Sequence, residues 1–304
     1  MPNKGIVIEF LVTKYLLIDI DNKQKIYAYQ RGKMKYFSYQ KNILNSNEYG
    51  KIKIGDVVSY KIKNNNFYID KILPRKNELK RPNIANIDQV FLVFSLIQPQ
   101  LNFKLLDKFL IVLHKFSLNI ILIFTKLDLV TKEQFKILKT KLAYYEKFYF
   151  TFYVNSKQKN SLEPLYSLLK EKITILAGQT GVGKSTLLNT LISLNLKTQE
   201  ISLSLNRGKH TTKNSKLYFF HNGYIADTPG FSKLDISNIA AEEIKNFYHD
   251  FQIFAKQCFF GHSCVHIKEK NCKIKEAYQK GLILEIRYKN YLSLFKQLQK
   301  NSIK

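Results

Sequence analysis

The stretch GQTGVGKS, residues 178–185, decides the fold of this 304-residue chain. It matches the pattern G-x-x-x-x-G-K-[ST], follows the apolar run ITILA (173–177) and precedes a helical pattern that starts near Lys184. Glycines in such a loop let successive backbone N–H groups turn toward phosphates, and the helix N-terminus adds a favourable dipole. We expect Lys184 to reach the β- and γ-phosphates and the Ser185 hydroxyl to bind Mg²⁺. The stretch therefore predicts a P-loop nucleotide site.

The sequence around this loop alternates between two patterns. The buried-type strands are QVFLVFSLI (89–97), NIILIFT (119–125) and FYFTFYV (148–154), and the helical stretches are FKLLDKFLIVLHKF (103–116) and KEQFKILKTKLAYYEKF (132–148). Continuously apolar strands that alternate with amphipathic helices indicate a parallel sheet covered on both faces. We expect residues 84–237 to form this α/β domain.

A base-reading motif stands at the end of the second strand. Thr125-Lys126-Leu127-Asp128 resembles the N/T-K-x-D motif of GTPases, with Thr125 where Asn is commoner. One carboxylate, Asp128, can accept from both N1–H and N2–H₂ of guanine, an edge that adenine lacks. The alternative is an ordinary helix N-cap. Ser156, in Val154-Asn155-Ser156, resembles the further loop that contacts the guanine oxygen, although that signal is weak by itself.

Asp227-Thr-Pro-Gly230 follows the apolar run YIA. D-x-x-G is by itself usually a turn. Because it lies 43 residues after Lys184, it is predicted to complete the P-loop site, with Asp227 near Mg²⁺ and the Gly230 N–H near the γ-phosphate. The base-reading motif at residue 125 precedes the P-loop at 178 and DTPG at 227, whereas in ordinary GTPases the P-loop comes first and the base-reading motif last. It predicts a circularly permuted GTPase domain, which is possible because domain termini lie close together.

The loop RGKHTT, residues 207–212, lies between the two phosphate motifs. Thr211 or Thr212 is a candidate ligand of Mg²⁺. Phe231 stands where many GTPases place a water-orienting Gln, so we expect slow hydrolysis until a partner orders the site. His210 is the candidate catalytic residue, the alternative being a solvated loop histidine.

The candidate GTP-binding residues are Thr125, Lys126, Leu127, Asp128, Ser156, Gly178, Gln179, Thr180, Gly181, Val182, Gly183, Lys184, Ser185, Thr186, Asp227 and Gly230, and those for magnesium are Ser185, Thr211 and Thr212.

The first 73 residues consist of short runs rich in β-branched and aromatic residues, separated by turn signals. Five or six such strands favour an OB-like β-barrel, although another small barrel fits nearly as well. Residues 74–83 are charged, bounded by prolines and without periodicity, and they are interpreted as a linker.

The C-terminal residues 238–304 are predicted to be mostly helical, starting with one amphipathic helix over 238–256. They contain all three cysteines and a histidine in the pattern Cys258-x₅-Cys264-x-His266-x₅-Cys272. Three thiolates and an imidazole at this spacing predict one structural, tetrahedral Zn²⁺ site, the alternative being unrelated reduced thiols. On this interpretation the zinc domain is a separate module, and its disruption leaves GTP binding largely intact.

The formal net charge is +26, from 49 Lys+Arg and 23 Asp+Glu. Such a charge favours nucleic acid as a partner, with an anionic membrane second. Only five of the basic residues are Arg, so an AT-rich genome that inflates Lys is the alternative. No signal peptide is recognisable, and the apolar run VFLVFSLI (90–97) is far shorter than the roughly 18 residues of a membrane span. We expect a cytoplasmic protein that does not bind membranes.

The whole pattern resembles the ribosome small-subunit-dependent GTPase A family, RsgA or YjeQ. The resemblance rests on the barrel, the permuted order of TKLD, GQTGVGKS, RGKHTT and DTPG, and the Cys-Cys-His-Cys segment followed by GLILEIRYKNYLSL. It implies a multidomain chain with an OB-like barrel, a permuted α/β P-loop GTPase domain and a helical zinc-binding domain. It also implies GTP hydrolysis stimulated by the small ribosomal subunit, and a role in late maturation of that subunit.

The family resemblance further implies GTP and GDP as ligands, rRNA contacted by the barrel and the zinc domain, and a histidine matching His210 that assists hydrolysis. A monomer is expected. The chain departs from the family pattern at Thr125, at Lys213, where a third Thr is frequent, and in the five residues between Cys258 and Cys264, where four are usual. Two other functions remain open at this point: a P-loop ATPase, and a non-catalytic RNA-binding module with a relic nucleotide site.

Overall fold

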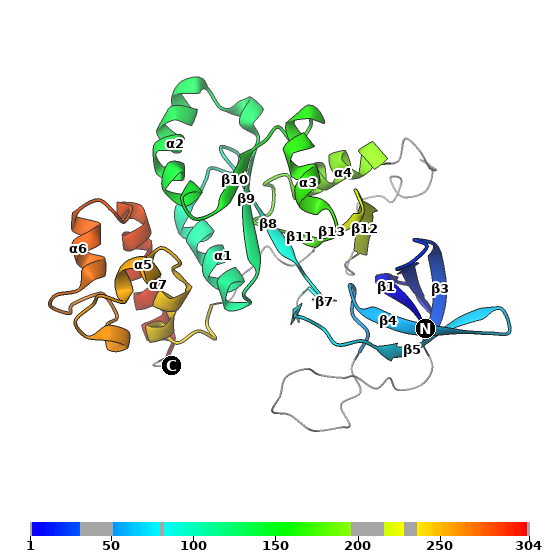
Figure 1. Ribbon diagram of the computed structural model, residues 1–304. Coiled ribbons are helices and arrows are strands. Elements are labelled where there is room, and N and C mark those ends of the chain that lie inside the picture. Colours follow the sequence, from blue (N-terminus) through cyan, green and yellow to red (C-terminus); the bar gives the residue numbers. More distant parts are fainter. Residues whose placement is uncertain (1, 31–50, 80–81, 196–215, 228–235, 303–304) are drawn as a thin grey trace. The chain divides into compact units, whose positions relative to one another are not determined.

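The computed structural model describes residues 2–30, 51–79, 82–195, 216–227 and 236–302 (Figure 1). The chain divides into two compact units. The first consists of Met1–Val90, Ser156–Ala177 and Lys184–Phe231, and the second of Phe91–Asn155, Gly178–Gly183 and Ser232–Lys304.

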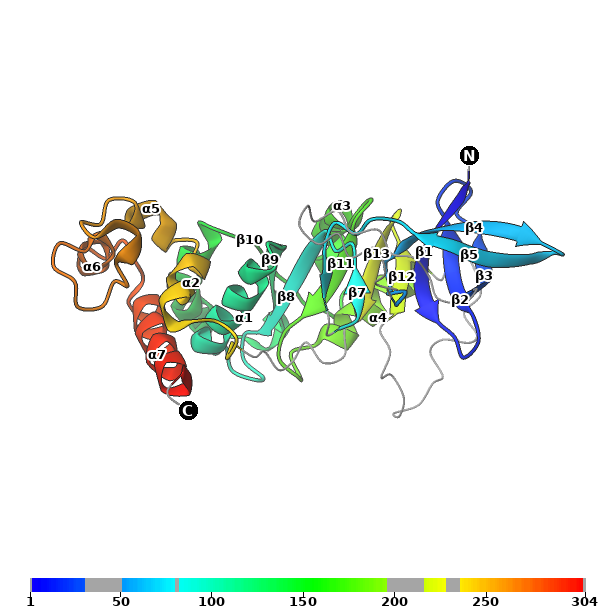
Figure 2. The ribbon, with the colours of Figure 1, turned by 90° about the horizontal axis from the view of Figure 1, so that it is seen from below.

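The N-terminal strands of the first unit form a closed five-stranded barrel, as predicted (Figure 2). The strands are β1 (Asn3–Phe10), β2 (Tyr15–Asp19), β3 (Lys25–Gln30), β4 (Val57–Lys63) and β5 (Asn66–Ile72), in the barrel order β1-β2-β3-β5-β4. The β3–β5 pair is parallel and the other pairs are antiparallel. Val7, Leu17 and Val58, all fully buried, fill the barrel because alternate residues of a strand face inward.

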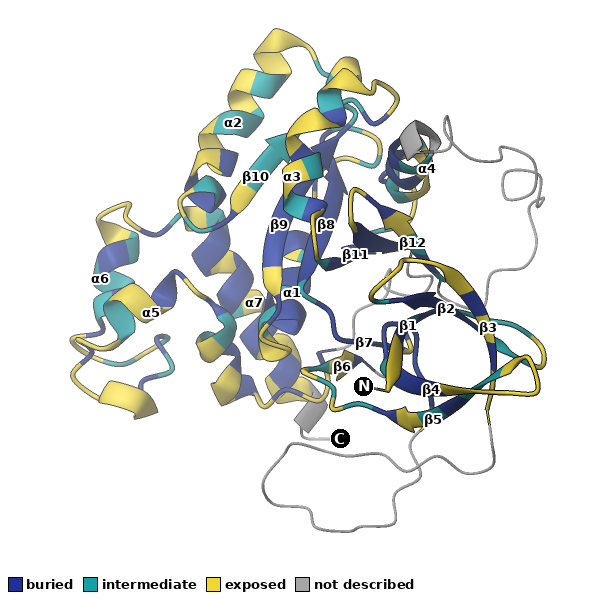
Figure 3. Cartoon of the chain, turned by 45° about the vertical axis from the view of Figure 1, so that its right-hand side comes forward, coloured by how far each residue is buried: buried dark blue, intermediate teal, exposed yellow. Residues whose placement is uncertain are grey.

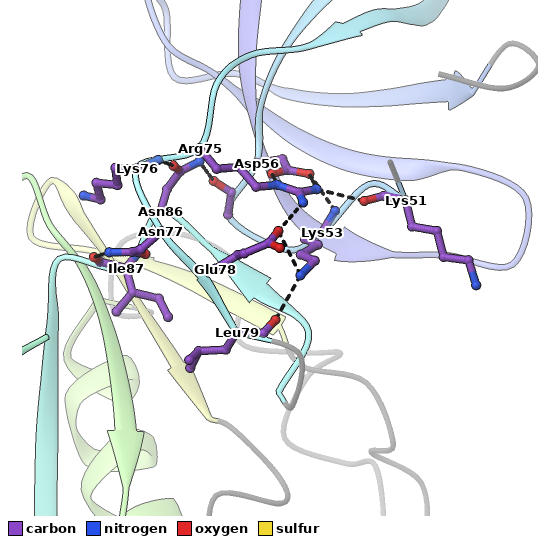
Figure 4. Close-up of polar contacts among 11 residues, drawn as sticks. Lys51, Lys53, Asp56, Arg75, Lys76, Asn77, Glu78, Leu79, Asn86 and Ile87 are labelled. Atoms are coloured by element: carbon purple, nitrogen blue, oxygen red, sulfur yellow. Dashed lines mark hydrogen bonds and ion pairs between the residues drawn. The ribbon is translucent and has the colours of Figure 1, made fainter. Parts of the chain in front are cut away.

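The predicted linker, residues 74–83, contains ordered structure. Its strand β6 (Glu78–Leu79) pairs with β7 (Ile84–Ala85). Arg75 donates from Nε and Nη2 to the two carboxylate oxygens of Asp56, at 2.6 and 2.8 Å, and Lys53 pairs with Glu78 at 3.0 Å (Figure 4). These polar contacts hold the segment together with the buried Leu79, and so few apolar residues give its sequence no periodicity.

The central sheet has six strands in the order β10-β9-β8-β11-β13-β12. They are β8 (Gln89–Ser95), β9 (Asn119–Thr125), β10 (Phe150–Tyr153), β11 (Ile173–Ala177), β12 (Lys216–Phe220) and β13 (Gly223–Asp227). Strands β8 and β11 are buried along their whole length, as continuous apolar runs predict (Figure 3). The edge strand β12 runs antiparallel to β13 and was not anticipated from the sequence.

The predicted helices of this domain are present. They are α1 (Phe103–Lys115), α2 (Lys132–Glu146), the single turn α3 (Tyr166–Leu169) and α4 (Lys184–Asn195), with 3-10 turns η1 (Leu127–Leu129) and η2 (Asn160–Leu165). The side chain of Asn102 caps α1 by accepting from the Leu105 N–H, and Thr131 and Gln134 form a capping box on α2.

The C-terminal part of the second unit consists of η3 (Ala241–Phe247), α5 (Phe251–Ala255), η4 (Gly261–Ser263), α6 (Lys273–Gln279) and α7 (Glu285–Ser302). The single helix predicted over 238–256 was wrong: the chain leaves the helical conformation at Tyr248, where φ is −92° and ψ is 94°. Tyr248 and Asp250 are both buried, at 0% and 1% exposed. Residues two positions apart face different sides of a helix, so one continuous helix would not bury both.

Among the described residues, no helix is both long enough and apolar enough to cross a membrane.

Candidate functional site

The P-loop has the geometry that its sequence predicts. Strand β11 ends at Ala177, the loop occupies residues 178–183, and helix α4 begins at Lys184. Gly178 has φ +137°, and a Cβ there would lie 2.0 Å from the Val93 carbonyl oxygen, so the position admits only glycine. The side chains of Ser185 and Thr186, in the first turn of α4, are exposed. The N-terminus of α4 is therefore open to an anion.

Two residues of the TKLD motif hold the P-loop. The buried Thr125 hydroxyl donates to the Val182 carbonyl oxygen at 2.5 Å and lies 3.3 Å from the Phe94 carbonyl oxygen. Lys126, whose φ is +61°, donates from Nζ to the carbonyl oxygens of Gly181, at 3.0 Å, and Gln98. The structure thus brings the base-reading motif and the phosphate loop together, although 52 residues separate Thr125 from Ala177 in the sequence.

The remaining base-reading candidates lie just after the ends of β9 and β10. Asp128 lies on η1 with its side chain exposed, and the N–H of Leu127 donates to the Val154 carbonyl oxygen at 3.3 Å, which ties this turn to the end of β10. Ser156 is 5% exposed, and its hydroxyl has no hydrogen-bond partner among the described residues. A buried hydroxyl without a partner is costly, so it marks a place where a ligand atom would be favourable.

Asp227 is the last residue of β13, and its backbone pairs with Leu176 of β11 immediately before the P-loop. The strand ends that carry Asp227 and the P-loop are therefore neighbours. The candidates His210, Thr211, Thr212 and Gly230 lie outside the described residues.

The four candidate metal ligands come together in the second unit. Cys258, Cys264, His266 and Cys272 are all buried, and their ligand atoms lie within 4.8 Å of one another. The Nδ1 atom of His266 lies 3.6 Å from the Cys258 sulfur and 3.5 Å from the Cys272 sulfur. Burial lowers the pKa of His266 to about 4, so its imidazole is neutral at pH 7, the form that binds a metal ion.

Side chains that are not themselves candidate ligands hold the backbone of the metal-ligand loop, residues 258–272. The hydroxyls of Tyr288 and Tyr291, both on α7, donate to the carbonyl oxygens of His266, at 2.7 Å, and Val265, at 2.5 Å. Glu269 accepts from the N–H groups of Val265, Ile267 and Lys268 at 2.6–3.0 Å. These bonds hold the backbone around the candidate ligands, as outer-shell partners do in metal sites.

Sequence reasoning missed a buried ionic cluster in this unit. Arg287, Asp107 and Asp250 are at most 1% exposed, and the guanidinium of Arg287 pairs with both carboxylates. The available signal was a charged residue at an apolar position of an amphipathic helix, as Asp107 is within FKLLDKFLIVLHKF.

Comparison with known proteins shows what the chain is similar to. The RsgA GTPase family model matches residues 72–237. The protein named small ribosomal subunit biogenesis GTPase RsgA from Phytoplasma mali is 53% identical over 97% of this chain and 96% of its own length. The chain belongs to the RsgA GTPase family.

Other members of the RsgA family agree. The Staphylococcus aureus (strain Mu50) protein of the same name is 40% identical over 83% of this chain and 86% of its own. The crystal structure of YjeQ from Thermotoga maritima superimposes with a TM-score of 0.80 at 33% identity, over 98% of this chain and 99% of its own. The crystal structure of YloQ, a circularly permuted GTPase, superimposes with a TM-score of 0.80 at 30% identity, over 99% of this chain and 96% of its own. The chain is therefore a GTP hydrolase, and the ATPase and relic alternatives are set aside.

Proposed function

We propose that this GTPase binds the small ribosomal subunit, acts in its late maturation, and hydrolyses GTP faster when bound there. The names of its relatives, small ribosomal subunit biogenesis GTPases, support the ribosomal role. The observation that supports the proposal most directly is the joining of the TKLD motif to the P-loop through Thr125 and Lys126, because it places a base-reading motif beside a phosphate loop in permuted order.

The proposed roles of the nucleotide-site residues follow from their chemistry. Asp128 would accept from N1–H and N2–H₂ of guanine. The Ser156 hydroxyl, which has no partner within the described part of the chain, would contact the base. The backbone of residues 178–183 and Lys184 would bind the phosphates, and Gly230 would contact the γ-phosphate. Ser185, Thr211, Thr212 and Asp227 would hold Mg²⁺, directly or through water, which neutralises phosphate charge when bound.

The proposed metal of the C-terminal site is a single structural Zn²⁺. Zn–S bonds near 2.3 Å and Zn–N bonds near 2.1 Å at tetrahedral angles place sulfur and nitrogen about 3.6 Å apart. The distances of 3.6 and 3.5 Å from His266 Nδ1 to two cysteine sulfurs agree with that value. Four protein ligands leave no open position, so the metal would stabilise the fold rather than take part in hydrolysis.

We also propose that rRNA is bound by the barrel and the zinc domain. On β3, Tyr27 and Tyr29 are 49% and 37% exposed, Lys14 lies over the Tyr27 ring at 4.5 Å, and Tyr29 is in register with Tyr68 of β5. Exposed aromatic rings among basic residues, on this face of an OB-type barrel, suit unpaired bases. The proposed domains are 1–73, 84–237 and 238–304, joined by 74–83, in a cytoplasmic monomer that does not bind membranes.

Sedimentation with purified ribosomal subunits tests the proposal. In the presence of a non-hydrolysable GTP analogue, the protein should sediment with small subunits and not with large ones, and binding should weaken steeply as salt rises because phosphate contacts release counterions. Replacing Tyr27 and Tyr29 by Ala should weaken binding. The control is Phe150→Ala on β10, where another exposed aromatic ring, 73% exposed, lies outside the barrel. Equal binding to both subunits would refute the proposal.

The catalytic assignment needs a separate variant. His210→Ala should lose most of the subunit-stimulated turnover while keeping GTP binding and sedimentation with small subunits, because the proposed histidine orients water and binds neither partner. Full stimulated turnover in His210→Ala would remove His210 from the reaction.

A further inference from the structure

Arg287, near the start of α7, joins three elements of the second unit. Its Nη1 donates to Asp107 in the second turn of α1, and its Nη2 donates at 2.9 Å to Asp250, which immediately precedes α5. Asn290, one turn further along α7, donates to the other Asp107 oxygen at 2.6 Å, and Tyr145 at the end of α2 donates to Asp107 at 2.8 Å. Both carboxylate oxygens of the buried Asp107 therefore accept hydrogen bonds.

The charges in this cluster are buried and paired. The guanidinium lies 4.3 Å from the centre of the Tyr248 ring, and Arg287 is 1% exposed. Burial by itself would raise the pKa of Asp250, but the charge and hydrogen bonds of Arg287 hold that pKa below its ordinary value. Separating such a pair would leave an uncompensated buried charge, which is strongly unfavourable. Arg287 therefore ties α7 to α1 through Asp107 and to the start of α5 through Asp250.

The neighbouring residues of α7 hold the candidate metal centre. Tyr288 and Tyr291 donate to the carbonyl oxygens of His266 and Val265, as described above. These two residues lie one and four positions after Arg287 in the sequence. One stretch of α7 therefore contacts both the metal-ligand loop and α1.

The chain just before α1 contacts the nucleotide loops. Asp107 is nine residues after Gln98, whose carbonyl oxygen accepts from Lys126 of the base-reading motif. The same Lys126 ammonium holds Gly181 of the P-loop. A second contact fixes the start of α1 to α7, since Lys104 donates to Ser293 at 2.7 Å. Side-chain contacts therefore connect the metal-ligand loop to α7 and α7 to α1, and residues 99–102 of the chain link α1 to Gln98, which contacts Lys126.

We propose that α7 couples the metal centre to the guanine-nucleotide site, with Arg287 as the positioning residue that sets the start of α1 and hence the Gln98 carbonyl opposite Lys126. The inference rests on the proposed nucleotide site but not on any ribosomal partner. Whatever displaces the metal-ligand loop then changes nucleotide affinity, and nucleotide binding changes the stability of the ligand loop by the same factor. This differs from the expectation, drawn from sequence, that the zinc domain is a separate module.

The test compares Arg287→Met and Arg287→Lys with a matched control in the full-length protein. The control is Arg75→Lys, because Arg75 is also a buried arginine that binds an aspartate through two nitrogens, but within the first unit. Lys cannot span two carboxylates as a guanidinium does, so Arg287→Lys should fold with its contacts to Asp107 and Asp250 impaired. Affinity is measured with a fluorescent GDP analogue, and backbone order by hydrogen exchange.

We expect both Arg287 variants to bind the GDP analogue about fivefold or more weakly than the wild type, and Arg75→Lys to bind it normally. Adding GDP to the wild type should slow hydrogen exchange in residues 264–267, and this protection should be lost in Arg287→Lys. A merely structural role would not produce that protection in the first place. If Arg287→Met does not fold, Arg287→Lys decides the result.

Two results would overturn the proposal, and they are distinguishable. The coupling alone would be refuted by the following combination. The wild type selects guanine nucleotides, folded Arg287→Lys binds them with an affinity within twofold of the wild type, and GDP does not slow hydrogen exchange in residues 264–267. Failure of the wild type to select guanine nucleotides would refute the proposed nucleotide site and the coupling with it.

Discussion

The hydroxyl of Thr125 donates a 2.5 Å hydrogen bond to the main-chain oxygen of Val182. Thr125 ends β9 and Val182 lies in the P-loop, and both residues are fully buried. Thr125, whose side chain is shorter than that of the Asn commoner at this position in GTPases, thus contacts the P-loop directly. The substitution leaves a direct contact between the loop that reads the base and the loop that binds the phosphates.

Thr125→Val keeps the shape of this side chain but removes its hydroxyl. It should weaken GTP binding, since the buried Val182 carbonyl loses its donor at a cost of about 1–3 kcal/mol, part of which the nucleotide site bears. Titration with a fluorescent GTP analogue measures the effect, and Thr125→Ser, which keeps the hydroxyl, is the control. Equal affinity for Thr125→Val and the wild type would show that the contact does not support the site.

Asp128→Asn tests how the base is chosen. The substitution replaces one acceptor by a donor opposite N1–H and N2–H₂ of guanine, so GTP affinity should fall sharply. Xanthosine triphosphate, which has an oxygen at position 2, should gain affinity. Competition between the two nucleotides measures the change, and the assignment is wrong if the variant keeps the wild-type preference for GTP.

The C-terminal site should contain one zinc ion per chain. Elemental analysis of natively purified protein measures it, and absence of zinc would contradict the assignment. Cys264→Ala should destabilise the C-terminal part of the second unit, because the binding free energy of a closed zinc site, on the order of 10 kcal/mol, is also folding free energy. Hydrogen exchange in α6 and α7 should rise while exchange in the β-barrel stays unchanged.

His114 should make the second unit sensitive to mild acid. Burial, the stacked ring of His249 and the charge of Arg287 lower the pKa of His114 to about 4, against the weaker opposing effect of Asp250. Its Nε2 lies 2.9 Å from the Tyr149 hydroxyl. The folded state therefore binds this proton less well than the unfolded state, whose histidine has its ordinary pKa near 6.5.

The contribution of His114 to stability is complete above pH 6.5 and is lost as the pH falls toward 4. The loss at pH 5, relative to neutral pH, is about 2 kcal/mol. The difference in thermal stability of the second unit between pH 7.5 and pH 5 should consequently be smaller in His114→Gln than in the wild type. An identical pH dependence in the two proteins would show that His114 titrates normally.

Much of the fold could be predicted because its signals are local. Helix α4 begins at Lys184, where the P-loop pattern ends, and β9 ends at Thr125, where the apolar run meets TKLD. The four candidate metal ligands could be recognised because their types and spacing are specific. In these cases the residues of the sequence motif are the same residues that form the structural feature.

The parts that sequence did not predict depend on long-range polar contacts. Asp107 and Arg287 are 180 residues apart, and nothing in either helix indicates the other as its partner. The break at Tyr248 depends on Asp250 being drawn to Arg287, whereas the local pattern favours a continuous helix. The ordered segment after Pro74 likewise depends on Arg75 reaching Asp56. Such contacts have no periodicity, so local patterns do not show them.

The most direct measurement is GTP turnover with small ribosomal subunits, with large subunits and with neither, at equal concentrations and constant salt. We predict slow turnover by the protein alone, no change with large subunits, and an increase of at least an order of magnitude with small subunits, as expected when a partner completes a GTPase site. The same rate in all three conditions, or equal stimulation by both subunits, would contradict the proposed function.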